Sequence, residues 1–333
     1  MDKRSDGQEP ETAGQSANRR RLTAIAIALG VSLAVYMLAR ATRSDVVTFS
    51  FLLVLPAAVG ALAAYLGDPQ GTRPRRFYFT TPCWIMLGVV VLSVIVLREG
   101  TICVLMLAPL WAPLMLAGSL LTYFLRKKLR DKARHGRAYG LGLLALPLLA
   151  MQIEPAIPLP IQTATVTRSA VIDASPDHLW PLLKGIPDVQ PGEGRWNLTQ
   201  DLVGVPRPLG ARLVGQGLGA TRLARWQHDV AFREVIDTWQ PGRRIGWRFV
   251  FDDMSHWHYT DRHLLPASTY LRIESGGYRI DPIAPGRSRV TLHTTYRMRT
   301  PVNGYAALWG EQFLGDLEEN LLALISQRAG EKR

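Results

Sequence analysis

The clearest candidate for acid–base chemistry in this sequence is Glu234, which lies between Phe232 and Ile236 in an alternating run. Residues two apart share one face of a strand, so Glu234 would point the same way as these apolar neighbours. If that face points inward, burial raises the pKa of the carboxyl group, which could then act as an acid or base. The alternative is a sheet edge or outer face, with Glu234 paired to an arginine such as Arg222. His228 is the second candidate for catalysis. The sequence alone does not decide whether Glu234 or His228 has a catalytic role.

Histidines and aspartates gather in the same part of the chain. They are His228, His256, His258 and His263, with Asp252, Asp253 and Asp261. A metal site needs three or four converging ligands, and the segment 254–268 has the composition of a loop that fixes no such convergence. We therefore expect exposed loop histidines, no metal site and no cofactor.

Aromatic side chains recur in the second half of the chain, where they could line a pocket for a hydrophobic ligand or form ordinary core. The candidates are Trp226, Phe232, Trp247, Phe249, Phe251, Tyr296, Trp309 and Phe313. The sequence contains no Ser-His-Asp spacing, Walker loop, dinucleotide fingerprint or HExxH motif. The glycines at 215–219 precede no helix and are typical of a turn between strands.

The elements that must position these side chains are predicted as a strand, a helix, about six strands and a long helix. A β-branched run predicts the first strand over 163–173, and Ser175-Pro176-Asp177 has the pattern of a helix N-terminus. Further strands are predicted over 212–216, 220–228, 231–239, 243–252, 269–283 and 288–297. The helical stripe within 303–328 comprises Tyr305, Leu308, Trp309, Phe313, Leu317, Leu321 and Leu324. We expect this helix to cover the apolar face of the sheet, burying Trp309, Phe313, Leu317 and Leu321.

These residues resemble a known superfamily. The phrases SAVIDASPDHLWPLL, FREVIDTWQPGRRIGWRFV and SRVTLHTTYRMRT, with the closing helix, are similar to SRPBCC domains, the START-like and polyketide cyclase-like helix-grip superfamily. The resemblance is closest to bacterial membrane-anchored members. It implies an α+β domain whose curved antiparallel sheet wraps round the C-terminal helix, with a cavity for a hydrophobic ligand. Members bind lipids, sterols, quinones or polyketides, and some catalyse cyclisation or dehydration, so the fold alone names no function.

Long uncharged runs fill the first half of the chain. They cover 22–38, 46–66, 77–97 and 101–125, and a shorter run covers 138–151. Because a helix needs about 20 apolar residues to cross a bilayer core, the sequence predicts a multi-pass protein of the cell membrane with four or five transmembrane helices. The four long runs contain no Asp, Glu, Lys, Arg or His, so we expect an anchor rather than a pump.

The net charge of +12 belongs almost wholly to this first half. Residues 1–137 carry a net charge of +10 and residues 138–333 a net charge of +2, so the cations flank the spans and form no nucleic-acid face. Predicted loops on the side of the N-terminus hold 15 Lys and Arg against 3 on the other side. This asymmetry predicts a cytoplasmic N-terminus. If 138–155 crosses as a fifth span, the C-terminal domain lies outside the cytoplasm, which is the arrangement we expect.

The expected organisation is a basic cytoplasmic tail over 1–21, a membrane domain over 22–155, a proline-rich linker over 156–162 and a ligand-binding domain over 163–330. The first functional hypothesis is a membrane-anchored binding protein for a hydrophobic small molecule or lipid. The second is a cyclase- or dehydratase-like enzyme acting on a polyketide- or isoprenoid-like substrate. The third is an interaction protein whose cavity is filled by side chains. Expected partners are the lipid bilayer and a hydrophobic ligand, and no nucleic acid.

Overall fold

The computed structural model describes residues 9–41, 47–97, 100–128, 136–259 and 265–331. The chain divides into two compact units. Residues 1–99 and 104–158 form a helical unit, and residues 159–333 together with 100–103 form the second unit. The residues that the sequence singles out for chemistry all lie in the second unit.

The helical unit follows the apolar runs of the sequence. Its elements are α1 (Glu9–Ala41), η1 (Ser50–Val54), α2 (Leu55–Gly67), α3 (Arg75–Val91), η2 (Leu92–Leu97), α4 (Thr101–Lys128), α5 (Gly136–Ile153) and η4 (Glu154–Ala156). Among the described residues, four helical segments are long and apolar enough to cross a membrane: Asn18–Ala39, Ser50–Gly67, Arg75–Leu97 and Thr101–Lys128. The four long runs are therefore helices of the length that a span requires.

Two of these helices approach each other closely at glycines. A Cβ atom placed on Gly60 of α2 would meet the backbone of Met115 in α4, and one placed on Gly118 of α4 would meet the backbone of Ala57 in α2. Only glycine permits such backbone contact. Small residues at helix crossings are typical of helices that associate in a bilayer, where close packing stabilises the pair.

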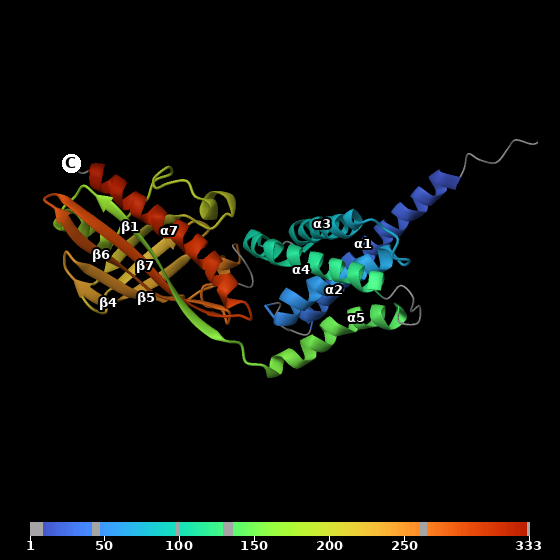
Figure 1. Ribbon diagram of the computed structural model, residues 1–333. Coiled ribbons are helices and arrows are strands. Elements are labelled where there is room, and N and C mark those ends of the chain that lie inside the picture. Colours follow the sequence, from blue (N-terminus) through green and yellow to red (C-terminus); the bar gives the residue numbers. More distant parts are fainter. Residues whose placement is uncertain (1–8, 42–46, 98–99, 129–135, 260–264, 332–333) are drawn as a thin grey trace, which may run out of the picture. The chain divides into compact units, whose positions relative to one another are not determined.

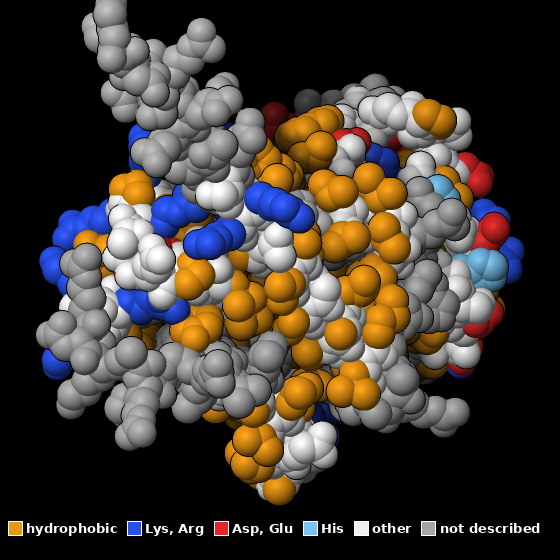
Figure 2. All heavy atoms as spheres, turned by 90° about the vertical axis from the view of Figure 1, so that its right-hand side faces the viewer, with side chains coloured by type: hydrophobic (Ala, Val, Ile, Leu, Met, Phe, Trp, Pro, Cys, Tyr) orange, Lys and Arg blue, Asp and Glu red, His pale blue; other side chains and the backbone are white. Residues whose placement is uncertain are grey.

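The outer surface of the helical unit is rich in exposed hydrophobic side chains. They include Trp84, Leu87, Ile95, Leu121 and Phe124. Figure 2 shows hydrophobic side chains gathered over one face, with Lys and Arg side chains beside them. Apolar side chains exposed in such numbers mark an interaction surface, and on helices of this length they are typical of contact with lipid.

Within the described residues, the second unit contains a seven-stranded antiparallel sheet with the order β1-β7-β6-β5-β4-β3-β2 (Figure 1). The strands are β1 (Ile161–Ile172), β2 (Pro208–Val214), β3 (Thr221–Trp226), β4 (Ala231–Gln240), β5 (Arg244–Val250), β6 (Leu271–Ala284) and β7 (Arg287–Arg299). From β2 onward each strand pairs with the next one in the sequence, and β1 pairs with β7. Each predicted strand has its counterpart, and β2 begins four residues earlier than expected.

Two helices pack against one face of this sheet, which we call the inner face. α6 (Pro176–Lys184) is capped by Ser175, whose hydroxyl accepts a hydrogen bond from the His178 N–H, as the sequence predicts. α7 (Asn303–Glu331) runs along the sheet and packs mainly on β1 and β7 (Figure 1). The core between them includes Leu179, Leu183, Ile245, Leu292, Leu322 and Ile325. A curved sheet with a long C-terminal helix on its inner face is the helix-grip fold expected from the resemblance.

The buried side of α7 differs from the predicted stripe. Leu308 is 70% exposed, and Trp309, Phe313 and Leu317 are only half-buried. The most buried stripe is instead formed by Gly315, Glu318, Leu322, Ile325 and Ala329. The prediction holds for Leu324, which is 1% exposed. It was wrong for the residues nearer the start of the helix because it followed large apolar side chains, whereas part of the contact uses glycine. A Cβ on Gly315 would collide with the guanidinium of Arg168.

Candidate functional site

An ion pair lies buried on the inner face of the sheet. Arg222 of β3 and Glu234 of β4 are directly opposite each other in the strand register. The distance from Arg222 Nη1 to Glu234 Oε2 is 2.7 Å, and the two residues are only 5% and 6% exposed. Glu234 therefore combines features of both alternatives that the sequence left open. It is buried on the inner face, as the first alternative holds, and it is paired with Arg222, as the second holds.

Arg222 is fixed by further contacts around its guanidinium group. Its Nε donates a hydrogen bond of 3.1 Å to the carbonyl oxygen of Lys184, at the end of α6. The guanidinium carbon lies 4.5 Å from the ring centre of Trp247 and 5.9 Å from that of Tyr278. Both aromatic residues are 3% exposed. The cation therefore joins α6 to strands β3, β4, β5 and β6 inside the domain.

A second buried carboxylate comes from the helix. Glu318 of α7 is 2% exposed, and within the described residues neither of its carboxyl oxygens makes a well-formed hydrogen bond, although the backbone N–H of Arg168 lies near them. Thr294 of β7 is the polar side chain that approaches it. The indole N–H of Trp247 is also buried without an acceptor among the described residues. In the strand register, Trp247 is opposite Gly276, and Gly276 is opposite Thr294, so these polar groups lie in one row across three strands.

The environment changes the acidity of these groups. Burial raises the pKa of Glu318 to about 8, and the Thr294 hydroxyl and the positive charge of Arg168 offset that rise only in part. Burial also raises the pKa of Glu234, against the opposing charge of Arg222. The pKa of Tyr278 is raised for the same reason. Near neutral pH, Glu318 is therefore largely a protonated acid, able to donate a hydrogen bond or a proton.

An aromatic cluster lies on the inner side of β3, β4 and β5. The ring of Phe232 is 5.8 Å from those of Trp226 and Phe249, 5.7 Å from that of Phe251 and 6.0 Å from that of Trp257. Trp257 belongs to η6 (Ser255–Tyr259). Phe232 is buried and the other four rings are half-buried. The structure therefore brings together four of the predicted cavity residues, and Trp257 joins them.

The other predicted cavity residues lie apart from this cluster. Trp247 packs under Arg222, as described above. Tyr296 of β7 is buried against α7, where Gly310 leaves room for its ring. Trp309 and Phe313 are neighbours on α7 with ring centres 5.3 Å apart. Both rings are half-buried, as are four of the five rings of the aromatic cluster.

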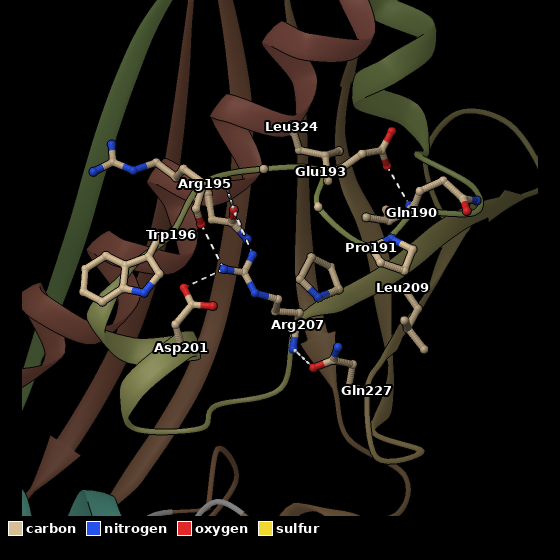
Figure 3. Close-up of a pocket in the computed structure, with 15 residues that line it drawn as sticks. Gln190, Pro191, Glu193, Arg195, Trp196, Asp201, Arg207, Leu209, Gln227 and Leu324 are labelled. Atoms are coloured by element: carbon tan, nitrogen blue, oxygen red, sulfur yellow. Dashed lines mark hydrogen bonds and ion pairs between the residues drawn. The ribbon is translucent and has the colours of Figure 1, made fainter.

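A pocket of about 300 Å³ opens beside the C-terminal half of α7 (Figure 3). It is lined by the loop 189–196, by Arg207 and by Asn320 of α7. Arg207 donates a hydrogen bond of 2.7 Å to Asp201 and one of 3.0 Å to the Arg195 carbonyl oxygen. None of the predicted cavity residues lines this pocket. Its polar groups satisfy one another, so it has the character of a polar surface recess.

His228, the second catalytic candidate, is exposed in the turn between β3 and β4. Its φ angle is 60° and that of Asp229 is 58°, values that two-residue hairpin turns require at both central positions. His228 therefore occupies a central position of this hairpin turn, and its role in catalysis stays a prediction.

No group of three or more His, Cys, Asp or Glu side chains that could hold a metal ion occurs in the part of the chain that the structure describes. His263 and Asp261 lie outside the described residues, as does the side chain of His258. The remaining loop candidates, Asp252, Asp253 and His256, are exposed. The carboxylate of Asp252 forms an ion pair with Arg233, with a distance of 2.5 Å from Arg233 Nε to Asp252 Oδ2.

Sequence reasoning missed Glu318, although a signal for it exists. Glu318 lies three residues after Gly315 and four before Leu322, which is the spacing of one helix face. A stripe drawn through small residues as well as large apolar ones would have placed Glu318 on the buried side. Tyr278, which follows the glycine pair 276–277 in β6, was not among the predicted site residues.

The strand order, the capped helix α6 and the terminal helix define the second unit as a helix-grip domain. Residues 163–327 match the family described as polyketide cyclase / dehydrase and lipid transport. The chain therefore carries a domain of this SRPBCC and START-like family over these residues. No curated protein matches the chain.

Solved structures similar to this chain include three proteins of different sources. Norcoclaurine synthase from Thalictrum flavum is 12% identical, with a TM-score of 0.34, covering 52% of this chain and 90% of its own. The Zhui aromatase/cyclase from Streptomyces sp. R1128 is 13% identical, with a TM-score of 0.33, and the match covers 52% of this chain and 97% of the cyclase. A START superfamily protein from Mycobacterium smegmatis is 11% identical, with a TM-score of 0.34, covering 51% and 99%. The assignment of the domain rests on the strand order and the family match.

Proposed function

We propose that this chain is a membrane-anchored binding protein whose C-terminal domain holds a hydrophobic small molecule or lipid on the inner face of its sheet. The observation that carries the proposal is Glu318, a carboxyl group that is 2% exposed and has neither an ion pair nor a well-formed hydrogen bond among the described residues. Burying a polar group without a partner costs free energy. A bound molecule with a polar end would remove that cost.

The apolar side chains of the domain support a ligand that is mainly apolar. Half-buried aromatic rings lie on β3–β5 and on α7, and Trp247 offers a second unpaired donor. Ligand sites of this kind combine apolar walls with a few polar groups that fix orientation. The family description, which includes lipid transport, agrees with such a ligand.

Mass spectrometry of the full chain purified in mild detergent tests the proposal. We expect a hydrophobic compound to co-purify with the wild-type chain and to be depleted from Glu318→Leu. The matched control is Glu311→Gln on the same helix, because the side chain of Glu311 is 54% exposed. A wild-type chain that carries nothing beyond detergent and the bulk lipids of the membrane would refute the binding function and favour a domain filled by its own side chains.

A second candidate function is an enzyme of the cyclase or dehydratase kind. Glu318 favours it, since an acid with a pKa of about 8 is protonated at neutral pH and can transfer a proton. The co-purified compound, once identified, provides the substrate for the assay. Conversion seen as a change in its mass over time, and abolished in Glu318→Gln, would establish catalysis. Binding without conversion would leave the binding function alone.

The anchoring part of the proposal is a bundle of five spans with the helix-grip domain outside the cytoplasm. The contact between Glu154 and the start of the second span supports it. The carboxylate of Glu154, in η4 after α5, accepts hydrogen bonds from the backbone N–H groups of Phe49 and Ser50. Both groups belong to the helical unit. The end of α5 and the beginning of η1 therefore lie at the same level of the bundle.

A further inference from the structure

A basic recess lies on the outer face of the sheet, at the end where β1 begins. Its volume is about 290 Å³, and its lining includes Ile161, Ser268, Thr269, Arg272, Arg297 and Arg299. This recess belongs to neither the inner face nor the polar pocket beside α7. Its three arginines are the groups that a ligand would meet there.

The strand register brings these arginines together. Arg272 of β6 is directly opposite Arg297 of β7, and Arg299 follows two residues later on the same face. Like charges opposite each other across a strand pair are destabilising. Glu274 pairs with Arg297 at 3.2 Å, but no carboxylate among the described residues pairs with Arg272 or Arg299, which are both exposed. The recess therefore has an excess of positive charge that an anion would neutralise.

The position of the recess in the chain indicates where that anion comes from. η4 ends at Ala156 and β1 begins at Ile161, and an extended chain over these five steps reaches about 18 Å at most. Ile157 is 61% exposed and Ile161 is 62% exposed. If α5 ends at the membrane surface, as the anchoring part of the proposed function holds, Ile161 and the recess beside it are tethered close to the lipid headgroups.

We propose that this recess binds the phosphate group of an anionic membrane lipid. The planar guanidinium groups of arginine match phosphate oxygens with paired donors, and the hydroxyl group of Thr269 can add a single donor. An exposed isoleucine, Ile161, in a basic recess suits the boundary between headgroups and acyl chains. The site would hold the domain against the bilayer in one orientation, which suits a domain that exchanges a hydrophobic ligand with the membrane.

The test compares Arg272→Gln/Arg299→Gln with a charge-matched control, Arg225→Gln/Arg289→Gln. Arg225 and Arg289 are exposed arginines of the same domain, outside the recess. Native mass spectrometry of the full chain in detergent would measure binding of phosphatidylglycerol and phosphatidylcholine. We expect wild type and control to bind phosphatidylglycerol more tightly than phosphatidylcholine. The recess variant should lose about 30-fold in affinity for phosphatidylglycerol, since each arginine near an anionic surface accounts for about fivefold.

Hydrogen exchange in nanodiscs locates the site. We expect phosphatidylglycerol nanodiscs, compared with phosphatidylcholine nanodiscs, to protect amides in 265–272 and 296–300 of the wild-type chain only. Arg272→Lys/Arg299→Lys, which keeps the charge, should retain part of the affinity, and this excludes simple misfolding as the cause of the loss. Equal phosphatidylglycerol binding by the recess variant and wild type would overturn the proposal. Inorganic phosphate that binds in the recess and displaces phosphatidylglycerol at similar concentration would show a free-anion site instead. Either outcome leaves the inner-face binding function untouched.

Discussion

Two buried carboxylates of the same domain differ in what surrounds them, and that difference decides their chemistry. Glu234 has a guanidinium 2.7 Å away, whereas Glu318 has no ion pair within the described part of the chain, because Arg168 is engaged by Glu311 and Glu319. A paired carboxylate is held in place by its cation. An unpaired one in an apolar site keeps its proton at neutral pH, which makes Glu318 the residue best placed to meet a ligand as a donor.

The raised pKa of Glu318 predicts a pH dependence of stability. In the unfolded chain the carboxyl group loses its proton near its ordinary pKa of 4.5, whereas the folded domain keeps it up to about pH 8. The folded state therefore binds more protons between these values, and stability falls as the pH rises through this window, by up to about 1.4 kcal/mol per pH unit. Thermal unfolding of the full chain at pH 5, 6, 7 and 8 measures this change.

Glu318→Gln isolates that contribution, because glutamine is neutral at every pH. The charged and titratable groups around Glu318 are Arg168 on β1, Glu311 on α7 and Tyr278 on β6, and the variant leaves them in place. His293, whose pKa is lowered by burial, acts in the opposite direction and is common to both chains. An unchanged pH profile in Glu318→Gln would mean that Glu318 is not the protonated group.

The buried ion pair leads to a prediction about unpaired charge. Arg222→Met leaves Glu234 buried without its cation and should destabilise the domain by about 3–5 kcal/mol. Arg222→Met/Glu234→Leu removes both charges and should be less destabilising than the single change. Hydrogen exchange of the β3 and β4 amides in the purified chain would report the free energy of opening. A double variant as unstable as Arg222→Met would show that the pair contributes more than the mutual neutralisation of two buried charges.

At the scale of elements, the alternation of apolar residues in the sequence predicts the strands. It does not predict which side of α7 is buried. In β5, Ile245 and Trp247 face inward two residues apart, with turn residues on either side, so the pattern alone predicts the strand. α7 combines large apolar residues on two sides with glycines at the closest contact. The sequence therefore predicts the helix but not its rotation, because which side is buried depends on partners such as Tyr296 and Arg168 in β7 and β1.

The rotation of α7 predicts that replacing different side chains of this helix by alanine destabilises the domain to different extents. Ile325 is fully buried, so Ile325→Ala should cost about 2–5 kcal/mol in stability through lost contacts and the cavity left behind. Phe313 is half-buried, and Phe313→Ala should cost clearly less, at most about 2 kcal/mol by area. Thermal unfolding of the two variants side by side measures the order. A larger loss in Phe313→Ala would mean that α7 buries the stripe expected from the sequence.

At the scale of the whole molecule, the division into two units predicts independent folding of the second one. Residues 159–333 contain every strand of the described sheet, α6, α7 and the core between them. A domain of this size buries enough surface to fold alone. The fragment should be soluble, β-rich by circular dichroism and cooperative in thermal unfolding. An insoluble fragment without β-rich circular dichroism would contradict a boundary in the proline-rich linker.

The last prediction concerns the side of the membrane on which that domain lies. Positive charge in the loops predicts a cytoplasmic N-terminus, so the first span ends, and the second begins at η1, on the far side. Glu154 accepts hydrogen bonds from Phe49 and Ser50 at this beginning, which draws the end of α5 to the far side as well. Because α5 follows the basic segment 126–137, it would cross the bilayer, and its 18 residues rise about 27 Å, close to a bilayer core of ~30 Å. Alkaline phosphatase fused at Arg333 should therefore be active and a fluorescent protein fused there dark, with the reverse result for fusions after Lys128. A fluorescent, phosphatase-negative C-terminus would mean four spans and a cytoplasmic helix-grip domain.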